Sequence, residues 1–247
     1  MVSLPFIGLT GGFLSGFLGV GGGVILLPLL TFVGVVPLKH ATGTGLVHVL
    51  IASAIGTLAH ARTGIVDVRA GLILGIAGVG GGFLGAFLSV PFSVGTLERI
   101  FLFVVALAIV LLFIPSNLDT EDYKKGDFSP VAGITIGFGV GLLVGLLGVG
   151  GGFLVIPLMI YVLKIPLMIT IGTSLLIIFI SSLGTIWAKV GVGHIDVTVT
   201  SLVLIGSVVG TLVGAHASRR VHVKLLRSAL LMTLVAIFIA VGYQTIF

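Results

Sequence analysis

Gly19-Val20-Gly21-Gly22-Gly23, followed by apolar residues up to Pro28, returns as Gly148-Val149-Gly150-Gly151-Gly152, followed by apolar residues up to Pro157. The offset is constant at 129 residues, the separation between Gly21 and Gly150. Each copy lies inside a long apolar stretch. In lipid every backbone N–H and C=O must be satisfied within the protein, so a glycine-rich break survives only where it is buried or lines a cavity. Paired breaks at matching positions of two halves point to the binding site of a transporter.

The composition indicates an integral membrane protein. Hydrophobic residues make up 57% of the 247 residues and charged residues only 8%, against about 25% in an ordinary soluble domain. The mean hydropathy is +1.38, which leaves too little polar surface for a soluble globule. The chain has no cysteine, which excludes disulfides and thiolate metal sites. The net charge of +5 is scattered, whereas nucleic-acid binding needs a clustered basic face, so no nucleic-acid partner is expected.

The apolar runs predict a bundle of membrane helices, since most are close to the ~20 residues that a spanning helix needs. The runs cover 4–35, 41–61, 69–92, 97–115, 130–163, 168–189, 197–217 and 223–246. The only clearly hydrophilic segment is 116–129. We therefore expect one integral membrane domain with a first repeat at 1–115, a hydrophilic linker at 116–129 and a second repeat at 130–247.

The duplication extends well beyond the glycine runs. Pro37 matches Pro166, Gly43-Thr44 matches Gly172-Thr173, and the aspartate at Asp67 returns at Asp196. The fold class expected is an all-α membrane protein with two homologous repeats of about four helical segments, the first segment of each broken at its glycine run.

The two long segments, 4–35 and 130–163, allow two arrangements. Each can be a single crossing helix with a midplane break, which gives parallel repeats, or a re-entrant hairpin with the glycines at its tip, which gives inverted repeats. Full crossings distribute the Lys and Arg residues seven against five between the two sides, and hairpins distribute them nine against three. The sharper asymmetry favours the hairpins, because cytoplasmic loops carry the excess of Lys and Arg. Both arrangements place Arg219 and Arg220 in the cytoplasm and both termini outside.

The motifs together resemble a known transporter family. The doubled G-V-G-G-G with its downstream proline is followed by A-T-G-T-G-L at Ala41 and T-I-G-T-S-L at Thr170, and H-x-R-x-G-x-V-D runs from His60 to Asp67. This pattern is similar to the TauE/SafE family of sulfite and organosulfonate exporters, over essentially the whole chain. The second half departs from it, with Ala188-Lys189-Val190 in place of H-x-R. The resemblance implies a small transporter that exports sulfur-containing anions without a nucleotide-binding domain.

The glycine breaks predict an anion site. A half-helix that starts after Gly23 or Gly152 leaves its first N–H groups unpaired and carries a partial positive charge, and missing side chains let an oxyanion approach the backbone. Pro28 and Pro157 loosen the same turns because proline has no N–H to donate. The candidate substrate-binding residues are Gly21, Gly22, Gly23, Thr44, His48, Gly150, Gly151, Gly152, Thr173 and Ser174.

Each candidate also has a structural interpretation. Glycines let helices pack closely, and hydroxyls in helices often bond back to their own carbonyls. His48 can be an anion ligand or proton carrier, or a buried neutral residue bonded to a carbonyl. Packing is the expected role of a third run, Gly80-Gly81-Gly82, which has no strand before it as a dinucleotide motif requires. Asp67 and Asp196 are expected to cap helix N-termini.

These observations predict a secondary transporter in the inner cell membrane that exports a small sulfur-containing anion such as sulfite, sulfoacetate or a related organosulfonate by alternating access. The alternative is an anion channel or a permease for a different small anion. An enzyme is not expected, because no Ser/His, paired-Asp or H-E-x-x-H arrangement is visible. No cofactor and no metal are expected, the lipid bilayer is the expected surrounding, and the sequence predicts no particular oligomeric state.

Overall fold

The two long apolar runs each fold as a pair of helices separated at the glycine run. The computed structural model describes residues 3–32, 38–114, 123–147, 151–189 and 196–246, and every regular element in these ranges is an α-helix. The first run forms α1 (Ser3–Leu18) and α2 (Gly23–Phe32), and the equivalent run of the second half forms α6 (Pro130–Leu147) and α7 (Gly152–Tyr161).

The other apolar runs form long single helices. These are α3 (Leu38–Ala61), α4 (Val68–Leu88), α5 (Val94–Phe113), α8 (Leu167–Lys189), α9 (Val197–Ser218) and α10 (Val223–Ile246). Among the described residues, seven helices are long and apolar enough to cross a bilayer, namely α6 and these six. Large apolar side chains such as Phe103 and Ile239 point outward from the bundle, as expected where the surrounding solvent is lipid. The chain is therefore an all-helical, multi-pass membrane protein.

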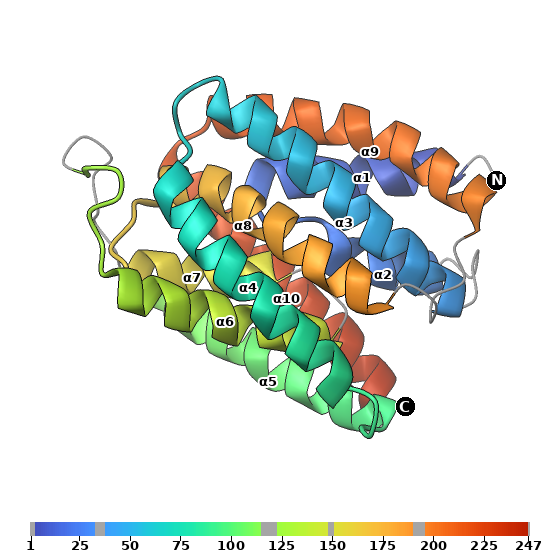
Figure 1. The fold of residues 1–247 in the computed structure, drawn as a ribbon. Coiled ribbons are helices and arrows are strands. Elements are labelled where there is room, and N and C mark those ends of the chain that lie inside the picture. The colour runs from blue at the N-terminus through green and yellow to red at the C-terminus, as the bar shows by residue number, and fades with distance from the viewer. Residues whose placement is uncertain (1–2, 33–37, 115–122, 148–150, 190–195, 247) are drawn as a thin grey trace.

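The two helix pairs run in opposite senses through the bundle. In Figure 1, α1 begins at the right-hand end of the bundle and α2 runs back toward that end, whereas α6 begins at the left-hand end and α7 runs back toward it. The arms of each pair also contact one another. Both described termini of the chain lie at the right-hand end.

Glycine stripes join the first helix of each half to the third apolar segment of the other half, α1 to α9 and α6 to α4. A methyl group added to Gly12 of α1 would lie 2.3 Å from the carbonyl oxygen of Ser207 in α9. The equivalent addition to Gly141 of α6 would lie 2.2 Å from the carbonyl oxygen of Gly78 in α4. Both contacts therefore recur at the 129-residue offset of the sequence repeat. Backbones approach this closely only where small residues line both helices.

The third glycine run also serves helix packing, which confirms its expected role. A methyl group on Gly81 would lie 2.1 Å from the carbonyl oxygen of Phe138 in α6, and one on Gly85 would lie 2.0 Å from that of Leu142. Gly80 to Gly82 lie in the middle of α4 without interrupting it.

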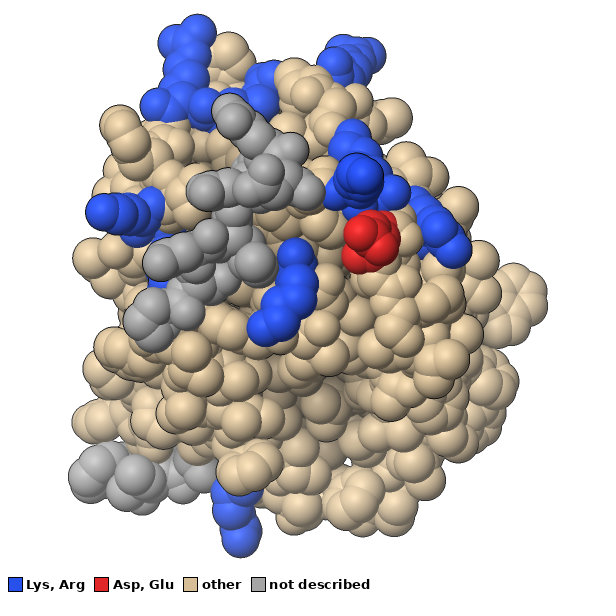
Figure 2. All heavy atoms as spheres, turned by 90° about the vertical axis from the view of Figure 1, so that its left-hand side faces the viewer, with Lys and Arg blue, Asp and Glu red and all other residues tan. Residues whose placement is uncertain are grey.

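Basic residues concentrate at one end of the bundle. Figure 2 views the end that lies to the left in Figure 1, and Lys and Arg side chains gather on it. The helix ends on this side carry nine of the twelve Lys and Arg residues, and those on the opposite side carry three. The nine are Arg62, Arg69, Lys124, Lys125, Lys164, Arg219, Arg220, Lys224 and Arg227, and the three are Lys39, Arg99 and Lys189.

Candidate functional site

The first glycine run breaks the helix by adopting left-handed backbone conformations. Gly19, Gly21 and Gly22 have φ angles of +76°, +78° and +71°, which side chains with a Cβ rarely tolerate. The chain then turns into α2, where Gly23 N–H donates to the Gly21 carbonyl at 2.9 Å and Leu26 N–H donates to the Gly22 carbonyl at 2.8 Å. Ile25 N–H also donates to the Gly22 carbonyl, at 3.1 Å. All three glycines from Gly21 to Gly23 are buried.

The second run provides the start of α7. Gly151 is the residue before the helix, with a φ of −86° and no side-chain capping bond, and its carbonyl accepts from Val155 N–H at 3.1 Å. Gly152 is the first helical residue. Gly150 lies outside the described residues. The amino end of α7, like that of α2, is buried inside the bundle.

The two breaks meet at the centre of the protein. A methyl group added to Gly152 would lie 2.7 Å from the Cα of Val20, which belongs to the first glycine run. Ile178 of α8 contacts both breaks, because its side chain would be 3.0 Å from a methyl group on Gly21 and 2.7 Å from one on Gly152. The amino ends of two helices from different halves are thus brought together, with one isoleucine against both.

His48 lies directly against the first break. The side chain is fully buried, and neither ring nitrogen has a hydrogen-bond partner among the described residues. Its Nε2 would be 2.5 Å from a methyl group on Gly22 and 3.5 Å from one on Gly11 of α1. A neutral imidazole carries one N–H donor and one acceptor nitrogen. Leaving such groups buried without partners costs about 1–3 kcal/mol each, so this ring is placed to gain from a polar ligand.

Three further buried hydroxyls lack partners among the described residues, and the sequence analysis did not single them out. Ser15 of α1 and Ser207 and Thr211 of α9 are each fully buried with a free hydroxyl oxygen. Ser15 lies beside His48, since its Cβ is 3.2 Å from the methyl position on Gly22. The sequence feature that could have identified them is a hydroxyl residue inside an apolar membrane span. Sequence does not show which hydroxyls bond back to their own helix.

The hydroxyls that the sequence did select have protein partners. Thr44 and Thr200 bond to each other through their hydroxyl oxygens at 3.0 Å, which joins α3 to α9. Thr173 donates to the Ile169 carbonyl at 2.7 Å and accepts from Asp67 N–H at 2.9 Å.

Ser174 supports the first break from α8. Its hydroxyl donates to the Gly19 carbonyl at 2.8 Å and to the Ile171 carbonyl at 2.9 Å. Ser174 therefore contacts the first break, whereas Thr173 contacts the start of α4, and both hydroxyl protons are directed at backbone carbonyls.

Both predicted helix caps are confirmed. Asp196 accepts from Thr198 N–H at 2.9 Å and Val199 N–H at 3.1 Å at the start of α9. Asp67 accepts from Ala70 N–H at 3.0 Å at the start of α4.

The Asp67 carboxylate also holds the segment that joins the two halves. Its second oxygen accepts from the Tyr123 hydroxyl at 2.8 Å and from Gly126 N–H at 2.6 Å. Burial, followed by the hydrogen bond and the charge of Asp67, raises the pKa of Tyr123 above its ordinary value of 10.0.

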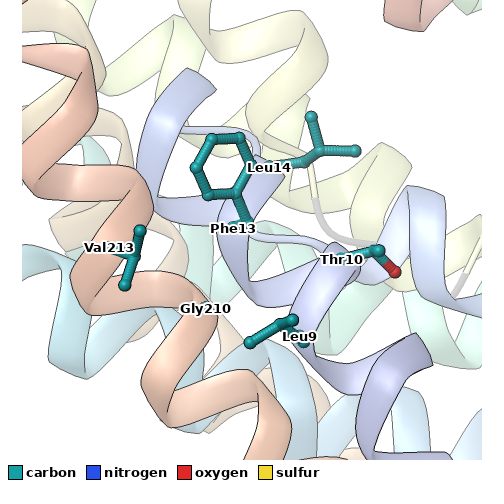
Figure 3. A pocket seen from close by; sticks show the side chains of 6 residues that line it. All are labelled: Leu9, Thr10, Phe13, Leu14, Gly210 and Val213. Carbon is teal, nitrogen blue, oxygen red and sulfur yellow. The ribbon is translucent and has the colours of Figure 1, made fainter.

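The surface hollows differ in their lining, and one of about 440 Å³ between α3 and α9 includes Arg62, His216 and Arg219. Another hollow of about 520 Å³ lies between α1 and α9, and Figure 3 shows its lining of Leu9, Thr10, Phe13, Leu14, Gly210 and Val213. The hydroxyl of Thr10 in this hollow donates to the carbonyls of Phe6 and Ile7 in its own helix. No group of three His, Asp or Glu side chains within the described ranges is arranged to hold a metal ion.

Comparison with known proteins places the chain among membrane transporters. The sequence model of the family described as "Sulfite exporter TauE/SafE" matches residues 4–241. The probable membrane transporter protein YunE of Bacillus subtilis is 27% identical, over 100% of this chain and 97% of the relative. The probable membrane transporter protein MJ0441 of Methanocaldococcus jannaschii is 26% identical, over 91% of this chain and 88% of the relative. No solved structure matches the chain significantly.

Proposed function

This chain belongs to the sulfite exporter TauE/SafE family of membrane transporters, and on that premise we propose that it exports a small sulfur-containing anion by alternating access. Sulfite, sulfoacetate and related organosulfonates are the candidate substrates. The observation that carries the proposal is the meeting of two glycine-broken helix starts at Val20 and Gly152, beside the unpartnered His48 ring.

The chemistry of this meeting point suits an anion. The amino end of a helix presents unpaired N–H groups and about half a positive charge, and glycines allow an oxyanion to reach those groups. Within the bilayer such backbone is tolerated only where protein or a polar cavity satisfies it. We assign the substrate site to Gly21, Gly22, Gly23, Gly150, Gly151 and Gly152, with Thr44 and His48 beside them. In the same proposal, Thr173 and Ser174 reach the anion by exchanging their present carbonyl partners.

The proposed architecture is a pair of inverted repeats with two re-entrant hairpins, α1–α2 and α6–α7. Three observations support it: the opposite senses of the two pairs in Figure 1, the short lengths of α2 and α7, ten residues each, and the equivalent contacts of Gly12 and Gly141 at the repeat offset. Alternating access in such folds is rocking of one repeat against the other around a fixed central site.

The proposed orientation in the inner cell membrane follows from the basic end of the bundle. Cytoplasmic loops carry the excess of Lys and Arg, so the end on which basic side chains gather in Figure 2 is assigned to the cytoplasm. Both termini then face outward, since they lie at the opposite end. A basic cytoplasmic face would also raise the local concentration of an anion that is to be exported.

The proposal is tested by reconstituting the full chain in proteoliposomes and measuring uptake of labelled sulfite, sulfoacetate, sulfate and chloride. We expect saturable uptake of sulfite or an organosulfonate, with chloride a poor competitor. A lack of saturable uptake of every sulfur oxyanion would refute the proposed substrate class. Passage of chloride without saturation would instead indicate a channel.

A further inference from the structure

We propose that the two glycine breaks are not equivalent and that one anion binds per chain, at the first break, with His48 and Ser15 among its side-chain ligands. This inference rests on the proposed function and deepens it by assigning the anion to one of two breaks that the sequence presents as a matched pair. The amino end of α2 and the fully buried, unpartnered His48 ring point independently to this place.

The repeat offset allows the two breaks to be compared position by position. Gly22 of the first break corresponds to Gly151 of the second. Around Gly22 lie the Nε2 of His48, at 2.5 Å from the methyl position, and the Cβ of Ser15, at 3.2 Å. Around Gly151 lie Val144 and Val140, with their methyl carbons at 2.3 and 2.9 Å from the equivalent position.

The residues that differ are those that can bind an anion. Val144 stands at the position equivalent to Ser15, and Ile177 stands at the position equivalent to His48. Both are buried apolar side chains. An anion at the second break would lose its water and gain no donor from Val140, Val144 or Ile177, and burying an uncompensated charge is strongly unfavourable. At the first break the ring and the hydroxyl are already dehydrated, so much of that cost is met when the protein folds.

The difference in polar side chains between the two halves also holds for α9 and its equivalent, α4. Its unpartnered hydroxyls, Ser207 and Thr211, correspond by the repeat offset to Gly78 and Gly82 of α4, which have no side chain. Every buried side-chain polar atom without a partner in the described part of the protein therefore lies on α1, α3 or α9. In this proposal the second break binds no anion and has a structural role, because Gly152 packs against the backbone of Val20.

The charge environment defines how His48 binds. The ring lies against Gly11 of α1 and the Gly22 position that precedes α2, and the described parts of α1 and α2 contain no charged residue. Helices α8 and α9 also pack against α3, which carries His48. On α9 the only titratable residue is His216, which lies in its last turn and is exposed. No Asp or Glu occurs in the described residues of α1, α2, α3, α8 or α9, so in this proposal the anion is the counter-ion of a charged His48 ring. Binding of the anion and retention of a proton on His48 should therefore be mutually favourable.

The experiment replaces the polar residues of the first break with the apolar residues that stand at the equivalent positions of the second break. Ser15→Val and His48→Ile place the second-break residues at the first break. Val144→Ala and Ile177→Val are matched controls that alter the second break without removing a polar group. Binding of labelled sulfite to the purified chain gives the affinity and the number of sites, and thermal unfolding verifies that each variant is folded. His48→Gln keeps a donor at the ring position and provides a second variant in case His48→Ile fails to fold.

We expect one site per chain. Ser15→Val and His48→Ile should weaken binding by about tenfold or more each, since each removes a hydrogen bond to a charged group, while His48→Gln retains part of the affinity. The two controls should leave the dissociation constant within about twofold. Two sites per chain, or equal weakening by the controls, would overturn the inference while leaving the proposed function intact. Wild-type protein that neither binds nor transports a sulfur oxyanion would overturn both.

Discussion

The Cα of Val20 lies against Gly152, so close that a methyl group on that glycine would be only 2.7 Å away. These residues belong to glycine runs that are 129 positions apart in the chain, and each run provides the start of a short helix. The contact brings two helix amino ends together in the interior of a membrane protein.

Gly152→Ala should destabilise the protein through this contact. The added methyl group meets backbone atoms of Val20 and the side chain of Ile178, and backbone cannot move aside as a flexible side chain does. Overpacking of this kind costs about 1–3 kcal/mol. Thermal unfolding in detergent measures the effect. Gly95→Ala serves as the control, because the space around Gly95 is open, and an equal loss in both variants would show that the Val20 contact is unimportant.

Asp67→Ala should cost more stability than Asp196→Ala. Both aspartates cap a helix, and loss of a cap costs about 0.5–2 kcal/mol. Asp67 in addition accepts hydrogen bonds from the Tyr123 hydroxyl and Gly126 N–H of the linker. Both donors lose this acceptor in Asp67→Ala. A comparison of the two unfolding temperatures checks the order. A larger effect at Asp196 would contradict the anchoring role of Asp67.

Alkaline titration should separate Tyr123 from an ordinary tyrosine. Its pKa is raised above 10.0 by burial and by the Asp67 carboxylate, so the folded protein keeps this proton at a pH where the unfolded chain releases it. The resulting stabilisation is complete below about pH 10 and is lost as the pH rises toward the folded pKa. Ultraviolet absorbance of tyrosinate, compared between wild type and Tyr123→Phe, isolates this group. A normal titration near pH 10 would be inconsistent with the Asp67 contact.

Labelling of single cysteines should distinguish inverted from parallel repeats. The chain has no native cysteine, so Lys39→Cys and Lys164→Cys each introduce one reactive thiol. Lys39 is in the first turn of α3 and Lys164 lies between α7 and α8, at opposite ends of the bundle in Figure 1. An impermeant thiol reagent should label them from opposite sides of the membrane. Labelling from the same side would restore the arrangement in which the broken segments cross.

Features of the sequence that depend on backbone chemistry predicted the fold well. The glycine runs predicted where α1 and α6 end, and apolar length predicted the long helices to within a few residues. The capping roles of Asp67 and Asp196 and the packing role of Gly81 are confirmed. Each of these depends on local rules, because glycine conformation, capping and close helix approach involve few residues.

The candidate site was less predictable because its chemistry depends on which side chains lack partners. The sequence analysis selected Thr173 and Ser174 but not Ser15, yet the first two hydroxyls bond to carbonyls whereas the Ser15 hydroxyl does not. The position of His48 against Gly22 depends on how α1, α2 and α3 pack, and no local pattern encodes it. The repeat offset shows that Val144 and Ile177 replace Ser15 and His48, but only the structure shows that Ser15 and His48 lie together at the first break.

Counterflow in proteoliposomes tests the central claim, export of a sulfur oxyanion by a carrier, most directly. Vesicles loaded with excess unlabelled sulfite are diluted into a trace of labelled sulfite, and the label inside is followed with time. A carrier that exposes one site alternately to each side accumulates the label transiently above its equilibrium level, and the account predicts this overshoot. Monotonic entry of label without an overshoot, at a rate proportional to concentration, would contradict it.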